Sequence, residues 1–152
     1  MTRGNARELA VHLIYAREFT GDEPQMVIAT RLEKEYYDML SAESPVYEDR
    51  PSRAQRAYID SVVMGVANRV DELNDAISKL SVDWDISRIS RLARTIMQLA
   101  MFEIQYVDDV PAGVAIAEAV RIAKLYESDE AGTFFIGFLG TFVRNLPSEV
   151  EV

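Results

Sequence analysis

Apolar residues recur at every third or fourth position along most of this 152-residue chain. This spacing is typical of α-helices that bury one face. It predicts helices near residues 4–18, 24–41, 52–80, 86–107, 111–127 and 129–145, and no segment alternates like a β-strand over a useful length. We therefore predict an all-α fold in a single domain over residues 1–152. Its architecture would be a compact helical bundle, with two helical sub-bundles around a long central third helix.

Local signals support several of these helix ends. Side chains able to accept a hydrogen bond from the first turn precede three helices: Ser52 the third, Asp85 or Ser87 the fourth, and Ser128 or Asp129 the sixth. Pro111 suits the first turn of the fifth helix, because proline lacks the N–H group that a helix leaves unbonded there.

Two acids interrupt apolar helix faces in the second half of the chain. Glu103 shares a face with Ile96, Leu99, Ala100 and Val107, and Glu118 shares one with Ala115, Ile122 and Leu125. A carboxylate in such a row costs free energy unless hydrogen bonds satisfy it. We expect both acids to be mostly buried and to accept hydrogen bonds from backbone N–H groups at a neighbouring helix start. A catalytic acid pair is the alternative, and two isolated carboxylates support it less well.

The composition argues against most site chemistries. The chain has no cysteine and one histidine, His12, so a His/Cys metal site and a Cys/His catalytic pair are excluded. Neither glycine-rich phosphate-binding motif occurs. We therefore predict no enzyme activity, no cofactor and no metal. Without a signal-peptide pattern or a run of about 18 apolar residues, a cytoplasmic protein with no membrane contact is expected.

The formal net charge of −9 disfavours general nucleic-acid binding, so any anion must meet one of the local basic groups. Arg3 and Arg7 lie one helical turn apart near the start of the chain, where such a pair can contact phosphate oxygens. Arg88, Arg91 and Arg94 form a second, slanted basic row. The alternative in both places is a solvated surface, with ion pairs to nearby acids in the second row.

Two aromatic side chains are further candidates for RNA contact. Tyr15 and Phe134 could stack on bases if exposed, although aromatic residues at helical spacing more often belong to the core. Phe134 is one of four closely spaced phenylalanines, with Phe135, Phe138 and Phe142. Four are too many for one buried stripe, so we expect one or two of them outside the core.

Several short motifs, in this order and spacing, resemble one family. They are ARE at Ala6–Glu8 followed by Tyr15, MFEI at Met101–Ile104, AEAVRIAKLY at Ala117–Tyr126, and FFIG at Phe134–Gly137. Together they resemble the NusB family of bacterial transcription antitermination factors, and the resemblance covers most of the chain.

The resemblance implies an all-helical NusB-type fold that binds the boxA RNA of ribosomal RNA operons together with ribosomal protein S10. Through S10 the complex would join the RNA polymerase elongation complex. Arg3 and Arg7 match RNA-gripping positions of the family, and Tyr15 and Phe134 match positions near the RNA surface. Formation of a homodimer, known for some family members, stays open.

The chain also departs from the family pattern. Gly4 and Asn5 stand where arginines are usual, and Ile136 replaces the asparagine of the FVNG signature. These changes favour a second hypothesis, a NusB-like protein-interaction scaffold with weak or lost RNA binding. A third hypothesis is the RNA-binding domain of an rRNA cytosine methyltransferase, which resembles the same fold. That enzyme needs a catalytic cysteine, and the sequence has none.

Overall fold

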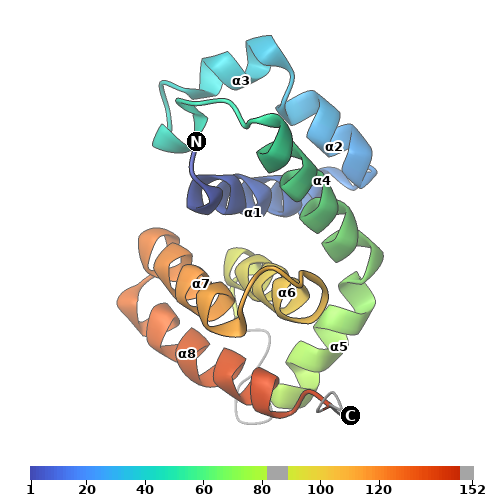
Figure 1. Ribbon diagram of the computed structural model, residues 1–152, viewed down its shortest axis with the longest axis vertical. Coiled ribbons are helices and arrows are strands. Elements are labelled where there is room, and N and C mark those ends of the chain that lie inside the picture. Colours follow the sequence, from blue (N-terminus) through green and yellow to red (C-terminus); the bar gives the residue numbers. More distant parts are fainter. Residues whose placement is uncertain (82–88, 148–152) are drawn as a thin grey trace. The chain divides into compact units, whose positions relative to one another are not determined.

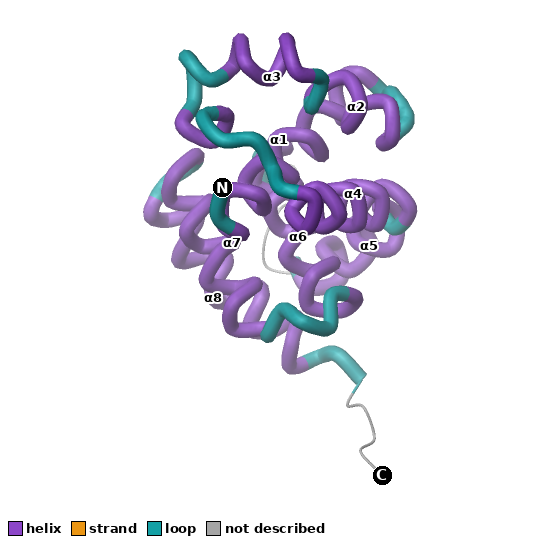
Figure 2. The backbone as a smooth tube through the Cα atoms, turned by 45° about the horizontal axis from the view of Figure 1, so that its top comes forward, coloured by secondary structure: helices purple, strands orange, loops and turns teal. Residues whose placement is uncertain are grey.

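The structure, a computed structural model, describes residues 1–81 and 89–147. Every regular element in these two ranges is a helix, as Figure 2 shows, so the all-α prediction is confirmed. The chain divides into two compact units, Met1–Val70 and Asp71–Val152. The predicted pair of sub-bundles corresponds to these two units.

The first unit contains α1 (Arg3–Thr20), α2 (Pro24–Arg31), α3 (Lys34–Leu40), the short 3-10 helix η1 (Pro45–Tyr47) and α4 (Arg53–Asn68). Helix α1 packs on α4 and α2, α2 also packs on α4, and η1 contacts both α1 and α3 (Figure 1). The apolar rows predicted for the first helix are buried: Ala6, Leu9, Ala10, Leu13, Ile14 and Ala16.

Both ends of α1 follow from its sequence. The Oγ1 of Thr2 accepts a hydrogen bond from the backbone N–H of Asn5 at 3.0 Å, which caps the first turn. Gly21 ends the helix with φ of 68°, a left-handed conformation that glycine adopts without a side-chain clash. The helix therefore starts close to Arg3, and this start fixes the positions of the N-terminal arginines.

The second unit contains α5 (Val70–Leu80), α6 (Arg91–Tyr106), α7 (Ala112–Tyr126) and α8 (Asp129–Arg144). Helix α5 begins at the last residue of the first unit. Helix α8 packs along α7, and both contact α6 (Figure 1). Phe135, Phe138 and Phe142 are buried in this unit, whereas Phe134 is half-buried, as expected for at least one of the four rings.

The predicted second helix, 24–41, is wrong as a continuous element. The chain leaves helical geometry at Leu32, and the carboxylate of Glu33 starts α3 by accepting backbone hydrogen bonds from Glu35 at 3.2 Å and Tyr36 at 3.0 Å. Glutamate is not among the common N-cap residues, so the pattern gave little warning of this break.

The predicted long central helix, 52–80, is also two helices, because Arg69 interrupts it with φ of −121° and ψ of 17°. The predicted N-cap at Ser52 is confirmed, and Gln55 completes a capping box with it. The buried apolar residues continue past the break, at Ile59, Val62, Val63, Val66, Leu73 and Ile77.

Two of the other predicted helix starts fall within the described ranges. Ser128 caps α8, as predicted, and Pro111 is the N-cap of α7 rather than its first helical residue. Ser90 caps α6. The predicted caps Asp85 and Ser87 lie outside the described residues, as does Arg88.

The two acids of the apolar rows have different surroundings. Glu103 is fully buried, at 0% exposure, on α6. Glu118 on α7 keeps 20% of its side chain exposed and pairs with Arg121, whose Nε lies 2.7 Å from its Oε2. The row predicted for α7 also ends outside the core, because Leu125 is 61% exposed. Glu118 therefore lies at the edge of the buried face.

Candidate nucleic-acid interface

The first turn of α1 places two of the predicted RNA-binding residues together. Arg3 is the first helical residue, and Arg7 follows one turn later on the same side of the helix. Both side chains reach the ring of Tyr58 on α4, the helix against which α1 packs. Arg3 and Arg7 therefore belong to one cluster within the first unit.

The two arginines differ in their access to solvent. The Arg3 Cζ lies 4.0 Å from the centroid of the Tyr58 ring, and Arg3 is exposed. The Arg7 Cζ lies 5.8 Å from the same centroid, and Arg7 is only 4% exposed. The structure thus presents Arg3 at the surface and buries Arg7 against the core. Of this pair, Arg3 is the better-placed phosphate contact.

Tyr15 lies further along α1 and has an aromatic neighbour that the sequence analysis missed. It is half-buried, and its ring meets that of Phe19 edge-to-face, with centroids 4.9 Å apart and planes at 80°. Phe19 itself is 59% exposed. Tyr15 lies twelve positions after Arg3 along the helix, a rise of about 18 Å. The spacing of four residues between the two rings was the signal that could have revealed this pair.

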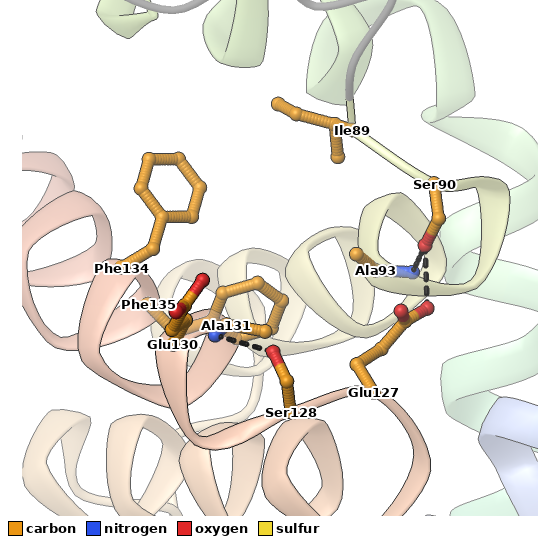
Figure 3. Close-up of a pocket in the computed structure, with 9 residues that line it drawn as sticks. All are labelled: Ile89, Ser90, Ala93, Glu127, Ser128, Glu130, Ala131, Phe134 and Phe135. Atoms are coloured by element: carbon orange, nitrogen blue, oxygen red, sulfur yellow. Dashed lines mark hydrogen bonds between the residues drawn. The ribbon is translucent and has the colours of Figure 1, made fainter.

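Phe134, the fourth predicted contact, belongs to the second unit, where it lines a pocket of about 270 Å³ (Figure 3). The pocket lies between the start of α6 and the start of α8. Figure 3 shows the Phe134 ring projecting from α8 on the opposite side of the opening from Ser90. Its ring contacts Phe135 at a centroid distance of 6.1 Å and Phe138 at 5.8 Å.

The serine hydroxyls that line this pocket cap helices α6 and α8. Ser90 accepts from the backbone N–H of Ala93 at 3.0 Å and donates to Glu127 at 2.5 Å, and Ser128 accepts from Ala131 at 3.1 Å. The two acidic residues of the lining, Glu127 and Glu130, are both exposed. Their charges would repel a phosphate at this opening, whereas the Phe134 ring offers a face on which an unpaired base could stack.

A largely buried polar cluster contacts α1 through His12. The Nδ1 of His12 and the hydroxyl of Tyr47 are hydrogen-bonded at 2.8 Å, and Tyr37 donates to the backbone carbonyl of Asp49 at 2.6 Å. Burial lowers the pKa of His12 below its ordinary value and raises the pKa of Tyr47 to about 12. This cluster joins η1 to α1 and stabilises the helix that carries Arg3.

Other site types find little support in the described part of the chain. Residues 1–81 and 89–147 hold no group of three histidine, cysteine or acidic side chains placed to bind a metal ion. Among the helices in those ranges, none combines the length and apolarity needed to cross a lipid bilayer. In the second basic row, Arg91 is exposed and Arg94 is half-buried.

The fold and the arginine cluster define an all-helical candidate nucleic-acid-binding protein. Residues 4–144 match the NusB family, and the chain belongs to that family. The transcription antitermination protein NusB of Acetivibrio thermocellus is 38% identical over 144 residues, which are 95% of this chain and 90% of that protein.

Solved structures agree on the fold. The NusB structure of T. maritima superposes with a TM-score of 0.76 at 23% identity, covering 95% of this chain and 92% of that one. A crystal structure of antitermination factors NusB and NusE in complex with dsRNA contains a chain with a TM-score of 0.72 at 18% identity. That match covers 93% of this chain and 96% of the other.

Proposed function

We propose that this protein is a transcription antitermination factor that binds the boxA RNA of ribosomal RNA operons together with ribosomal protein S10. Through S10 it would join the RNA polymerase elongation complex. The observation that carries this proposal is the 38% identity, over 95% of the chain, to a transcription antitermination protein. The presence of NusB, NusE and RNA in one related crystal structure supports both partners, since NusE is S10.

The first turn of α1 supports the RNA-binding part of the proposal. Arg3 is exposed there, and a guanidinium carries N–H donors arranged to meet phosphate oxygens. Arg7 is buried beside it, so its contribution would be to hold the cluster in place. Tyr15 and Phe134 are half-buried and would offer ring faces to unpaired bases.

The test is the affinity of the full chain for a boxA RNA oligonucleotide and for a scrambled oligonucleotide of the same composition, each with and without S10. We expect preferential binding of boxA, strengthened by S10, and weaker binding by the Arg3→Ala variant. Equal affinity for both oligonucleotides in the presence of S10 would contradict the proposed function.

The burial of Arg7 favours a second candidate function. With Arg7 only 4% exposed, and Gly4 and Asn5 lacking charge, one exposed arginine is left in the first two turns of α1. A NusB-like scaffold that binds S10 and has weak or lost RNA binding fits this observation. It predicts that the chain binds S10 alone as tightly as in the presence of boxA RNA, because the two partners would then not be coupled.

A further inference from the structure

One aromatic ring contacts both arginines at the start of α1. Tyr58 lies on α4 and is only 7% exposed, so the surrounding core holds its ring in place. The Arg3 guanidinium carbon lies 4.0 Å from the ring centroid, and that of Arg7 lies 5.8 Å from it. A single fixed ring therefore joins the exposed arginine to the buried one.

Such a contact suits a cation that must also bind an anion. A guanidinium over an aromatic face is attracted by the ring quadrupole. The ring carries no net charge, so the guanidinium keeps its positive charge, which a carboxylate partner would neutralise. The positive end of the α1 dipole lies at the same place and favours a negative ligand there. The ring can thus hold the Arg3 guanidinium at the start of α1, where a phosphate would also be attracted.

The contact with the ring also reduces the conformational entropy that the Arg3 side chain loses when RNA binds. A free arginine side chain has many rotamers, and fixing it on a phosphate costs about 0.5–1.5 kcal/mol in lost freedom. A side chain already held over a ring has lost part of that freedom before the RNA arrives. Arg7, buried beside the same ring, helps to keep the ring where Arg3 can reach it.

We propose that Tyr58 is a positioning residue for RNA binding, holding the Arg3 guanidinium in place for a backbone phosphate. This inference rests on the proposed function. Tyr58 itself need not touch the RNA, since it acts through Arg3. The proposed role requires an aromatic ring with an electron-rich face at position 58.

The decisive experiment replaces Tyr58 by pentafluorophenylalanine in the full chain, with Tyr58→Phe as the matched control. Fluorination keeps the ring's shape and apolar character but removes its attraction for a cation. We therefore expect the fold to be retained, and a thermal melt checks this. With S10 bound, we expect Tyr58→Phe to keep most of the affinity for a boxA oligonucleotide. The fluorinated protein should lose about 2- to 12-fold, the equivalent of the side-chain freedom that Arg3 would then lose on binding RNA.

Both ring replacements are then repeated in the Arg3→Ala background. We expect the difference between phenylalanine and its fluorinated form to disappear there, because the ring acts only through Arg3. In the protein that keeps Arg3, fluorination should also make the slope of log affinity against log salt shallower by about 0.7. This is the value for one phosphate contact on a single strand.

The outcomes separate the two proposals. If Arg3→Ala weakens RNA binding and fluorination does not, the role of Tyr58 is overturned and the RNA site stands. An equal effect of fluorination with and without Arg3 would also overturn it, since the ring would then act on the fold. If Arg3→Ala itself leaves the affinity for boxA intact, the RNA contact at α1 and the inference built on it are both wrong.

Discussion

Glu103 and Glu118 show at the scale of single residues how similar sequence positions receive different surroundings. We expect Glu103→Ala to lower the free energy of unfolding by roughly 1–3 kcal/mol, because a fully buried carboxylate leaves its hydrogen-bond donors unsatisfied when it is removed. Glu118→Ala should cost roughly 0–1 kcal/mol, since it breaks a partly exposed ion pair with Arg121. Urea denaturation of both variants measures the two costs.

The comparison between the two acids also tests the structural assignment. If Glu103→Ala unfolds at the same urea concentration as the unmodified protein but loses RNA or S10 binding, Glu103 has a functional role. A larger loss of stability for Glu118→Ala than for Glu103→Ala would contradict the burial that separates them.

His12 makes the stability of the first unit depend on pH. Burial lowers the pKa of His12, with the charge of Glu8 opposing this shift and that of Arg31 adding to it. The unfolded chain therefore takes up a proton near pH 6.5, at which the folded protein keeps His12 neutral. The contribution of neutral His12 to the free energy of unfolding is fully present above about pH 6.5. It is lost as the pH falls from there through the lower pKa of the folded state.

We expect the unmodified protein to lose more free energy of unfolding between pH 7.5 and pH 5.5 than a His12→Gln variant loses. The difference is limited to about 1.4 kcal/mol per pH unit for one titrating group. Glutamine can still bond the Tyr47 hydroxyl but does not titrate in this range. Denaturation curves at both pH values provide the test, and parallel losses in the two proteins would show that His12 does not titrate on unfolding.

At the scale of elements, two side chains in a capping box fix the start of α4. The hydroxyl of Ser52 accepts from the backbone N–H of Gln55 at 3.2 Å, and the Gln55 side chain accepts from the backbone N–H of Ser52 at 2.9 Å. Ser52→Ala should therefore destabilise the protein by about 1 kcal/mol. Thermal melts measure this loss.

The matched control is Ser61→Ala, the same chemical change at an exposed position inside α4. Alanine is a better helix former than serine there, so this variant should be as stable as the unmodified protein or slightly more stable. Equal melting temperatures for the two variants would mean that the capping box contributes nothing to stability.

The sequence predicted where helices form better than where they break. Buried apolar residues lie at three- and four-residue spacing on both sides of Arg69, from Val66 to Leu73, although Arg69 itself departs from helical geometry. Periodicity reports which residues are buried, so it does not detect a break at one residue between them. The same reasoning applies at Glu33, whose side chain starts α3 inside a continuous pattern.

At the scale of the whole molecule, the candidate site depends on contacts that spacing does not contain. The four-residue spacing placed Arg3 and Arg7 on one side of a helix, and the structure agrees. Arg7 is nevertheless buried, and its guanidinium carbon lies 5.8 Å from the ring centroid of Tyr58, which belongs to another helix. The packing of α1 against other helices, α4 among them, determines which arginine faces solvent, and the spacing along α1 does not contain this information.

The net charge of −9 sets the behaviour of the whole protein toward RNA. This negative charge repels a polyanion, and the first turn of α1 presents one exposed arginine. Each cationic contact to a single strand contributes a slope of about −0.7 to log affinity against log salt. For boxA RNA and the protein alone, we therefore expect poor affinity at physiological salt and a shallow slope, about −0.7. Binding of a basic S10 should raise the affinity and steepen the slope, because S10 adds cationic contacts to the same RNA.

RNA titrations at several salt concentrations, with and without S10, measure both slopes, and the Arg3→Ala/Arg7→Ala double variant provides the comparison. With S10 bound, this variant should lose roughly 1.5–3 kcal/mol of binding free energy, because Arg3 supplies one charge-assisted hydrogen bond and the buried Arg7 does not reach the RNA directly. A steep slope for the protein alone would assign the RNA contact to other basic residues, Arg91 among them, since Arg3 cannot supply several phosphate contacts. If the double variant binds as tightly as the unmodified protein at every salt concentration, α1 is not the RNA site. The protein-only scaffold would then be the better description, because its binding to S10 does not require a cation at the start of α1.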